Sequence, residues 1–579
     1  MKMSIGQFLF LRLRQMGIAH VFGMPGDFNL QLLEQIREVD GIEFVGTCNE
    51  LNASYAADGY ARLNGAGALL TTYGVGDLSA VCGIAGACAE HVPVVFISGT
   101  PPLYAMEGRL RVHHSLAEGN FDNVRNCLKE FTVAQARLTP ANAVEELDRA
   151  LLNCWREKMP VYIQVPSNIS YLMVDVPEHR LSLALPASDP ERQESAAQHI
   201  AALLGEAQRP TLLIDMDADR SAICAGLARL ADKQQIPYAA FRTGKGMLSE
   251  NSPLYLGIYN GNASSPAVAA AVERSDCLIA TAPCYVESSP MISPAGLPVA
   301  ANVYIRGNAV VIDGDVYEGV TARTLIERVI ELVAERPAIG RPPREQTPLA
   351  TAKAATALTQ ARLWTRMEHF FRSGDVVIAE NGTSAIAMTG VRLPDGTSYI
   401  SQMIWGSIGY TLPALLGAQT AQPQRRHILL IGDGSLQLTA QELSTILRRK
   451  LKPIIFVLNN RGYTIERYIL GMNADYNDIA NWDYTRLPDA FAPDAEVFVA
   501  HVHDETQLEA ALQEAESGTR ACLIELHLDP QDAPPALRSF GPMVAELDYG
   551  PRGPQRTQHA PAASAAATAA VNRLMRENA

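Results

Sequence analysis

Short apolar runs alternate with amphipathic stretches throughout the first 180 residues. Ala68–Tyr73, Val94–Ser98 and Val161–Val165 are apolar runs with the length of buried strands. Apolar positions recur at helical spacing in four other segments: Gly6–Met16, Phe28–Glu38, Asp77–Ala89 and Val144–Glu157. Strands that alternate with helices in this way predict a parallel sheet covered by helices on both faces.

The same rhythm recurs twice further along the chain. The second stretch has strand-like runs at Thr211–Ile214, Cys277–Ala282 and Val310–Ile312, with helical spacing at 192–206 and Thr321–Ala334. The third has strand-like runs at Val376–Ala379, His427–Ile431, Ile454–Leu458 and Leu523–His527. Proline-rich segments at about 177–191 and 336–350 separate the three stretches and are typical of linkers.

A chain of 579 residues is too long for a single hydrophobic core. We therefore predict an α/β protein with three doubly wound parallel-sheet domains, at residues 1–180, 190–340 and 351–555. The alanine-rich segment 556–579 has helical propensity but little apolar surface to bury, which indicates a peripheral or disordered tail.

Composition narrows the class of protein. Hydrophobic residues make up 47% and charged residues 19%, as in a soluble globular protein. A net charge of -14 without a basic stripe argues against a nucleic-acid partner. No apolar run reaches the ~18 residues of a membrane span, so no membrane partner is expected. The nine cysteines are scattered and never form CxxC, and the first residues lack a signal-peptide cleavage site, which indicates a cytoplasmic protein.

The stretch from His427 to Glu466 carries the densest candidate chemistry. A buried strand ends at Gly432 in a GDGS turn, and a second strand ends at Asn460, so parallel strands present oxygen ligands at one edge of the sheet. Thr439 and Glu442 have the spacing of a capping box for the helix between the strands. Asp433 and Asn460 suit Mg²⁺ that also takes phosphate oxygens, although GDGS alone is most often an ordinary turn.

A second group of candidates lies near the N-terminus. Asp27 follows a Pro-Gly turn, where its ordinary role is a helix N-cap. Glu50 lies in the first turn of a predicted helix, where an acidic side chain complements the dipole. His113 and His114 are adjacent in a loop, and such pairs are usually solvated. Taken singly, each residue has an adequate structural explanation.

Seven motifs in order change that assessment: PGDFNLQLL, NELNASYAADGYAR, VHHSL, GTS, WGSIGYT, GDGS and NNRGYTIE, with the 24 residues 435–458 between GDG and NN. Together they resemble the thiamin diphosphate-dependent 2-oxoacid decarboxylases over about residues 4–550. YNDIANWDYTRLP at 476–488 is similar to the phenylpyruvate, indolepyruvate and branched-chain members, with pyruvate decarboxylase a step further away. The three domains would then be pyrimidine-binding, central and diphosphate-binding.

The resemblance implies roles for the matching positions. Glu50 would hydrogen-bond N1′ of the aminopyrimidine, and Ile408 would force the cofactor into a V shape, although it also reads as a core residue. Asp433, Asn460 and the carbonyl of Gly462 would hold Mg²⁺. The other expected cofactor contacts are Thr383, Gly406, Ser407, Gly434, Ser435, Tyr463, Thr464 and Ile465.

The implied reaction is non-oxidative decarboxylation of a 2-oxoacid to an aldehyde and CO₂, through the cofactor ylide and an enamine. Asp27, His113, His114 and Glu466 match the proton-relay residues of the family. In that family the two halves of a site come from two subunits. A homodimer is therefore the implied minimum active unit, with a homotetramer as the expected larger assembly.

Substrate preference depends on a predicted pocket beside the thiazolium. By resemblance it contains Ala385, Ile386, Ile465, Ile469, Phe540 and Val544. Ala385 stands where relatives with a bulkier aromatic accept smaller or branched acids, so we expect aromatic 2-oxoacids to be favoured and branched or linear ones also accepted. Arg461 departs from the acidic or amide residue expected in its loop, with no evident consequence.

Three alternatives remain at this point: a pyruvate decarboxylase, a carboligase with the same cofactor and fold, or a non-catalytic protein that has kept the fold. A carboligase would not require the histidine pair or Glu466, since its intermediate attacks a second carbonyl instead of a proton. A non-catalytic protein would be expected to lose Glu50 or a magnesium ligand, and the sequence keeps both.

Overall fold

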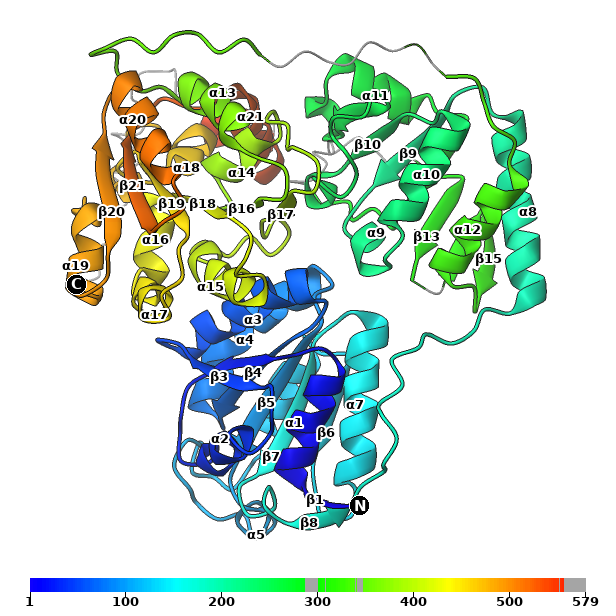
Figure 1. Cartoon of the computed structure of the whole chain (residues 1–579), viewed down its shortest axis with the longest axis vertical. Coiled ribbons are helices and arrows are strands. Elements are labelled where there is room, and N and C mark those ends of the chain that lie inside the picture. The colour runs from blue at the N-terminus through cyan, green and yellow to red at the C-terminus, as the bar shows by residue number, and fades with distance from the viewer. Residues whose placement is uncertain (287–299, 308, 339, 341–346, 551, 557–579) are drawn as a thin grey trace, which may run out of the picture.

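The structure is a computed structural model that describes residues 1–286, 300–307, 309–338, 340, 347–550 and 552–556. Three units, each built on its own sheet, lie around a common centre, with the first at the bottom of Figure 1, the central one at the right and the third at the left. This confirms the predicted α/β class with three sheet-based units. The tail at 556–579 lies outside the described residues apart from Arg556, as does part of the second predicted linker.

The first unit contains a six-stranded parallel sheet in the order β3-β2-β4-β5-β7-β6, and a small antiparallel pair, β1-β8, joins its two ends. Its strands are β1 (Lys2–Ser4), β2 (His20–Gly23), β3 (Glu43–Gly46), β4 (Gly67–Thr72), β5 (Val94–Thr100), β6 (Ala134–Arg137), β7 (Val161–Pro166) and β8 (Met173–Asp175). Its helices are α1 (Ile5–Gln15), α2 (Leu30–Ile36), α3 (Glu50–Asn64), α4 (Val75–Ala89), α5 (Leu103–Glu107), α6 (Asn123–Lys129) and α7 (Ala143–Glu157).

The central unit has a seven-stranded sheet in the order β11-β10-β9-β12-β13-β14-β15. Its strands are β9 (Pro210–Ile214), β10 (Tyr238–Ala240), β11 (Tyr255–Ile258), β12 (Cys277–Ala280), β13 (Val303–Arg306), β14 (Ala309–Ile312) and β15 (Asp315–Glu318). Its helices are α8 (Pro190–Glu206), α9 (Asp217–Arg220), α10 (Cys224–Gln234), η1 (Arg242–Gly244), η2 (Gly261–Ala263), α11 (Pro266–Glu273) and α12 (Ala322–Leu332).

The sequence pattern predicts a wholly parallel sheet in the central unit, but the sheet is mixed. β13, β14 and β15 pair antiparallel. Asp313 and Gly314, both with positive φ, connect β14 to β15, and Asp-Gly is a favoured two-residue hairpin turn. The connections on both sides of β14 are too short for the crossover that parallel strands require, so this edge of the sheet folds as hairpins.

The third unit has six parallel strands in the order β17-β16-β18-β19-β21-β20. They are β16 (Val376–Ala379), β17 (Ser398–Ile400), β18 (His427–Gly432), β19 (Ile454–Asn459), β20 (Val497–Val502) and β21 (Ala521–His527). The helices are α13 (Gln360–Phe370), α14 (Thr383–Met388), α15 (Thr411–Ala421), α16 (Asp433–Thr439), α17 (Glu442–Arg448), α18 (Thr464–Ile469), η3 (Asp475–Asn477), η4 (Tyr484–Arg486), α19 (Leu487–Phe491), α20 (Glu505–Ala515), α21 (Pro535–Tyr549) and η5 (Pro554–Arg556).

Two local predictions in this unit are wrong. The GDGS segment is not a free turn, because α16 begins at Asp433. Thr439 and Glu442 do not form a capping box. The Thr439 hydroxyl donates to the carbonyl of Gly409, and α17 begins without a side-chain cap. Glu442 instead reaches the first unit. Its carboxylate accepts hydrogen bonds from the Cys48 amide at 3.1 Å and from the Asn52 side chain at 2.7 Å.

The first and third units meet through α3 and α15, which lie side by side at their boundary (Figure 1). Two glycines allow the helix backbones to touch. A Cβ on Gly417 would lie 1.8 Å from the carbonyl oxygen of Ala56, and one on Gly59 would lie 2.2 Å from that of Ala414. Small residues are what permit such close helix packing, so this contact is fixed by backbone rather than by adjustable side chains.

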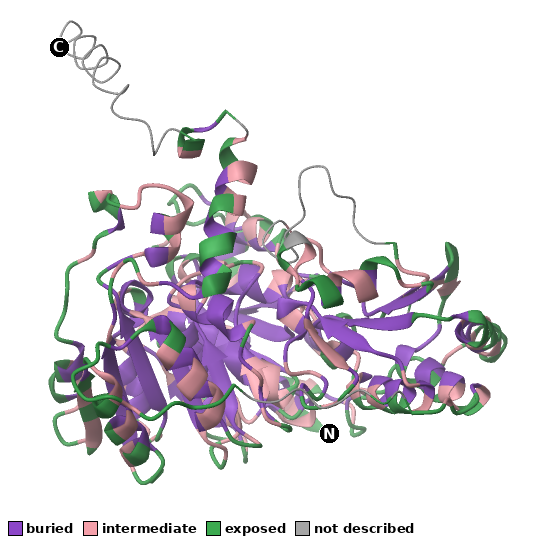
Figure 2. Cartoon of the chain, turned by 90° about the horizontal axis from the view of Figure 1, so that it is seen from above, coloured by how far each residue is buried: buried purple, intermediate pink, exposed green. Residues whose placement is uncertain are grey.

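The buried residues of the chain lie mainly in and around the strands. Figure 2 shows buried residues concentrated in the sheets, with exposed residues on the outer helices and loops. One apolar cluster joins the facing layers of the first and third units and includes Tyr55, Tyr60, Leu412 and Leu429. Among the residues that the structure describes, no helix has the length and apolar character needed to cross a membrane.

Candidate active site

Three polar side chains follow neighbouring strands of the third sheet, at the point where each strand ends. Glu380 follows β16, Asp433 follows β18 and Asn460 follows β19. The strands are parallel and in register, with Ala379 paired to Leu430 and Gly432 to Leu458. The three side chains therefore reach the same edge of the sheet, where open α/β sheets bind ligands. They line one cleft.

Three oxygen atoms converge at this edge, and we call Asp433, Asn460 and the carbonyl of Gly462 the oxygen cradle. As oriented in the structure, the Asn460 amide oxygen lies 2.7 Å from the Gly462 carbonyl oxygen and 3.3 Å from Oδ1 of Asp433. Three acceptors cannot satisfy one another, whereas a cation between them would. A few hard oxygen ligands suit Mg²⁺, which keeps water and phosphate oxygens as its other ligands.

The orientation of Asn460 could in principle be reversed, because amide oxygen and nitrogen are assigned from their partners. The neighbouring hydroxyl argues against reversal. Thr464 donates its hydroxyl proton to the carbonyl of Pro530 at 2.9 Å, so it remains an acceptor for the Asn460 amide nitrogen at 2.9 Å. The amide oxygen is thereby directed into the cradle, which is the arrangement that a bound metal ion requires.

The electrostatics of Asp433 agree with a cation site. The residue is 1% exposed and accepts hydrogen bonds from the amides of Gly434 at 2.8 Å and Gly462 at 3.2 Å. Burial nevertheless raises the pKa of Asp433 to about 7, because these backbone hydrogen bonds offset the desolvation only in part. A bound divalent cation would supply the missing stabilisation of the carboxylate.

Most of the predicted cofactor contacts surround the cradle. The cleft is lined by Thr383, Ile408, Gly434, Ser435, Tyr463, Thr464 and Ile465. Gly406 and Ser407 are not among the lining residues. The Asn381 amide contacts the carbonyl of Gly406 at 3.5 Å, and the Ser407 hydroxyl is paired with that of Tyr55 on α3. The cofactor roles of these residues remain predictions.

Glu466 lies on α18 and lines the same cleft. Its side chain is exposed at the rim, yet desolvation by the cleft walls, and secondly the negative charge of Asp548, raise the pKa of its carboxyl above the usual range. A carboxyl of this kind can exchange a proton closer to neutral pH than an ordinary glutamate. The structure thus places Glu466 beside the cradle with properties that suit acid–base chemistry.

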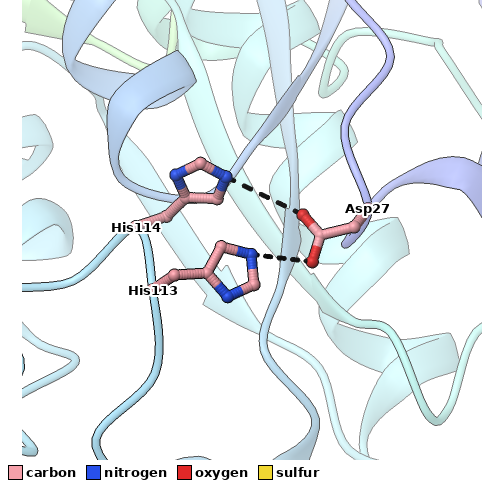
Figure 3. Close-up of side chains that lie close together, drawn as sticks. All are labelled: Asp27, His113 and His114. Atoms are coloured by element: carbon pink, nitrogen blue, oxygen red, sulfur yellow. Dashed lines mark ion pairs between the residues drawn. The ribbon is translucent and has the colours of Figure 1, made fainter.

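Asp27, His113 and His114 form a second group on the first unit, which we call the relay cluster (Figure 3). Nε2 of His113 lies 2.9 Å from the Asp27 carboxylate, and Nε2 of His114 lies 3.8 Å from its other oxygen. The His113 ring stacks on Phe28 at 5.0 Å. Asp27 does not cap α2, whose N-cap residue is Asn29. The sequence motifs had predicted this grouping, and the structure brings the three side chains together.

The loop that carries His113 and His114, which we call the relay loop, packs closely against the backbone at Gly74. Gly74 has φ +74°, and a Cβ there would lie 1.9 Å from the carbonyl oxygen of His114. No other residue type fits this position without moving the loop. Glu50 begins α3 with Asn49 as its cap, and its carboxylate lies beside Gly76 at the start of α4. The four predicted acid–base residues of the first unit therefore sit around the start of α4 and the loops beside it.

The cradle and the relay cluster do not meet within one chain. All the residues that line the cradle cleft belong to the third unit. Several large apolar side chains near the two groups are exposed, including Val75 and Leu78 on α4 and Leu438 on α16. Val75 and Leu78 are three residues apart on α4 and therefore lie on the same face of that helix.

Four of the six predicted pocket residues belong to one apolar cluster: Ile386, Ile465, Phe540 and Val544. Ile469 is half-buried at the end of α18 and lies outside this cluster. Ala385 is 0% exposed and packs in the core of the third sheet with Ala379 and Met388. Ala385 therefore belongs to a different apolar cluster from its neighbour Ile386.

The motifs did not single out Glu380 or explain Arg461. Glu380 is 2% exposed and accepts a hydrogen bond from the Thr411 hydroxyl at 2.6 Å, and burial raises its pKa to about 7. Glu380 could have been found from the sequence, because it directly follows β16 as Asp433 directly follows β18. Arg461 has φ +58°, and its positive charge contributes to lowering the pKa of His527.

Comparison with known proteins agrees with this architecture. Family models match in three successive segments: "Thiamine pyrophosphate enzyme, N-terminal TPP binding domain" at residues 3–124, the "central domain" at 197–289, and the "C-terminal TPP binding domain" at 380–526. The three α/β units, with the cleft at the edge of the third sheet, are therefore those of a thiamin diphosphate enzyme. The chain belongs to the thiamin diphosphate-dependent 2-oxoacid decarboxylases, a family of carboxy-lyases.

Among its relatives, an alpha-keto-acid decarboxylase of Mycolicibacterium paratuberculosis is 40% identical over 491 residues, which cover 84% of this chain and 87% of the relative. A pyruvate decarboxylase of Kluyveromyces lactis is 38% identical over 547 residues, covering 92% and 97%. Pyruvate decarboxylase isozyme 1 of Saccharomyces cerevisiae is 37% identical over 544 residues, with the same coverage. The cofactor is accordingly thiamin diphosphate, with Mg²⁺ as the usual partner metal of the family.

Proposed function

We propose that this 2-oxoacid decarboxylase forms an aldehyde and CO₂ and favours aromatic acids such as phenylpyruvate and indolepyruvate, with branched and linear acids also accepted. The supporting observation is Ile465, which lines the cradle cleft and also belongs to the apolar cluster with Ile386, Phe540 and Val544. An apolar surface beginning at the cofactor cleft suits a large hydrophobic side chain. Because Ala385 is in the core, the preference no longer rests on the volume argument made from that residue.

The oxygen cradle would hold Mg²⁺ through Asp433, Asn460 and the Gly462 carbonyl, with Gly434 and Ser435 beside the diphosphate. When bound, thiamin diphosphate supplies the carbon nucleophile and the electron sink that decarboxylation needs. Glu50 would hydrogen-bond N1′ of the aminopyrimidine and keep a proton there, and Ile408 would support the cofactor from below. Thr383, Tyr463 and Thr464 are the other cleft residues in position to contact it.

The relay cluster would deliver the proton that replaces carbon dioxide on the substrate. The Asp27 carboxylate lies 2.9 Å from the His113 imidazole, and the His114 imidazole lies beside both, so a proton would have a short path between the three groups. Glu466, on the cradle side, would share in this transfer and oppose the substrate carboxylate while it is charged. These acid–base groups favour decarboxylation to the aldehyde over carboligation, in which the carbon that lost carbon dioxide forms a bond to a second carbonyl carbon instead of to a proton.

The active unit in this proposal is a homodimer, with a homotetramer as the larger assembly. One chain supplies the cradle and its partner supplies Glu50 and the relay cluster. The separation of the two groups within the chain and the exposed apolar residues of α4 and α16 support this arrangement. The cytoplasmic location remains a prediction from the sequence.

Glu50→Gln tests the catalytic proposal. We expect turnover to fall by about 10²–10⁴-fold, the usual contribution of a general acid–base group, with folding and cofactor retention preserved. Glu34→Gln, an exposed glutamate on α2, is the matched control. Undiminished turnover in Glu50→Gln would refute the role of this residue.

A substrate panel tests the specificity. Initial rates on pyruvate, 4-methyl-2-oxopentanoate, phenylpyruvate and indolepyruvate should give the highest kcat/KM for the aromatic acids, and product analysis should give the aldehyde. A preference for pyruvate would refute the aromatic proposal, whereas a 2-hydroxyketone as the main product from one 2-oxoacid would favour a carboligase.

A further inference from the structure

Two histidines and a glutamate gather on one face of the third sheet, at a place that the proposed reaction does not use. His501 lies on β20, the edge strand, and pairs directly with Glu525 on β21. His527 lies two residues after Glu525 on the same strand and therefore points to the same face. We call these three residues the His-Glu-His triad.

The ligand atoms of the triad have the separations expected around one small metal ion. Nδ1 of His501 lies 3.2 Å from the Glu525 carboxylate and 3.4 Å from Nε2 of His527, which lies 3.5 Å from the other Glu525 oxygen. A tetrahedral zinc ion with bonds of about 2.0–2.1 Å places its ligands about 3.3 Å apart. The triad therefore forms three corners of such a tetrahedron.

One triad atom lacks an ordinary hydrogen-bond partner. Glu525 is 1% exposed, and its Oε2 receives no hydrogen bond within the described part of the chain, although it faces Nδ1 of His501. An unsatisfied carboxylate oxygen in a buried position is costly, and a bound cation would remove that cost.

Hydrogen bonds with neighbouring side chains orient the triad residues, as they do for the ligands of metal sites. Thr485 donates its hydroxyl proton to Asp483 at 2.9 Å, so it must accept from Nε2 of His501, which it contacts at 2.9 Å. In a neutral His501 the proton is then on Nε2, and Nδ1 presents a lone pair to the triad. Asn459 donates to the second Glu525 oxygen at 2.6 Å. Such partners fix the tautomer of a ligating histidine and the position of a ligating carboxylate.

A third histidine lies against the triad. His503 stacks on His527 with ring centroids 4.0 Å apart but is not one of the three ligands. His501 has a side-chain exposure of 49%, which leaves a path from solvent to Nδ1 and room for a fourth ligand from water.

We propose that His501, Glu525 and His527 bind a transition-metal ion of the zinc class, at a site separate from the oxygen cradle. Two imidazoles and one carboxylate suit Zn²⁺ and Co²⁺ better than Mg²⁺, which prefers oxygen ligands alone. The site is linked to the cradle through β19, because Asn459 holds Glu525 and the next residue, Asn460, belongs to the cradle. A simple ion pair between a protonated His501 and Glu525 is the alternative that the test must distinguish.

The test uses untagged holoenzyme saturated with thiamin diphosphate and Mg²⁺, so that the cradle is already filled. Zinc binding is measured by equilibrium dialysis and metal analysis, and Co²⁺ binding by visible absorption. We expect one Zn²⁺ per chain and the intense absorption of four-coordinate Co²⁺. His501→Gln and His527→Gln should each weaken zinc binding by at least about 10-fold. His503→Gln, which alters the neighbouring ring but no ligand, should leave it unchanged.

The relay cluster is the other group in the described residues with metal-ligating side chains close together, so His113→Gln is included. Zinc binding that is lost in His113→Gln but kept in His501→Gln would overturn the proposal. So would a holoenzyme that binds no zinc, as a simple ion pair predicts. Retention of the aldehyde-forming activity and of the melting temperature in His501→Gln would show that its loss of zinc is local.

Discussion

The oxygen cradle and the relay cluster have opposite degrees of burial. Asp433 is 1% exposed and is held by backbone amides of its own βαβ unit, whereas the side chain of Asp27 is 49% exposed and meets two imidazoles from a distant loop. A metal and diphosphate site benefits from fixed ligands. A proton relay needs groups that can change protonation state, and these depend on the surface that covers them. If the active unit is the proposed homodimer, the buried cradle is complete in one chain, whereas the exposed relay cluster is covered only by the partner chain.

Removing the cradle carboxylate should have the largest effect. Asp433→Ala is expected to lower affinity for thiamin diphosphate with Mg²⁺ by at least about 100-fold, since even outer contacts to a ligand are worth 10–100-fold. Cofactor titration and kcat measure this, with Asp489→Ala on the exposed part of α19 as control. Wild-type cofactor affinity in Asp433→Ala would show that the cradle is not the metal site.

Changing the relay cluster should affect turnover and not cofactor binding. Asp27→Asn removes the charge that faces His113 and is expected to lower kcat by about 10²–10⁴-fold, with the cofactor affinity of the wild type. The same cofactor titration and kcat measurement serve here. If Asp27→Asn instead lost the cofactor as Asp433→Ala does, the division of tasks between the two regions would be wrong.

Displacing the relay loop without changing its chemistry should have a smaller effect. Gly74→Ala introduces a Cβ that collides with the His114 carbonyl, and an alanine at positive φ is strained by about 1–3 kcal/mol. We expect kcat to fall by about 10-fold because a small misplacement of acid–base groups is costly. Gly17→Ala is the matched control, because Gly17 also has positive φ but nothing lies within 4 Å of its Cβ position. Equal loss of kcat in both variants would mean that strain alone accounts for it.

The last effect is on the stability of the fold rather than on turnover, and it concerns the buried carboxyl of Glu380. Because burial raises the pKa of Glu380 to about 7 from 4.5, the folded chain holds a proton that the unfolded chain releases. This contribution to stability is fully present below about pH 4.5 and is lost as the pH rises to about 7, up to about 3 kcal/mol. Glu380→Gln lacks this dependence, so its melting temperature should improve relative to wild type between pH 5 and 7.5. Exposed Glu34→Gln gives the background slope, and a parallel slope for Glu380→Gln would contradict the prediction.

The sequence pattern was sufficient for the features that depend on local periodicity. Apolar runs predicted β16, β18 and β19 to within two residues, and parallel pairing then placed Asp433 and Asn460 at one edge. It failed where identical local spacing serves a tertiary purpose. Thr439 and Glu442 are spaced as a capping box, but Glu442 is used to hold α3, and nothing local distinguishes the two uses.

Two further differences between the expectations from sequence and the structure concern the face of a helix on which a residue lies and a hairpin turn. Ala385 and Ile386 are neighbours on α14, and a rotation of about 100° per residue places Ala385 in the core cluster of the third sheet and Ile386 in the apolar cluster with Phe540. A match of sequence motifs does not show on which face of the helix each residue lies. The antiparallel edge of the central sheet could have been predicted, because Asp313-Gly314 is a hairpin signal between two strand-like runs.

The touching backbones of α3 and α15 have a consequence for motion. Helices separated by side chains can slide as rotamers change, but at Gly59 and Gly417 there is no side chain to rearrange. Glu50, in the first turn of α3, therefore lies on a helix whose contact with the third unit cannot be loosened by side-chain rotation, and we expect the first and third units of a chain to move together. Opening that admits substrate or releases product is then expected in the loops around the site, such as those of His114 and Gly462, rather than between α3 and α15.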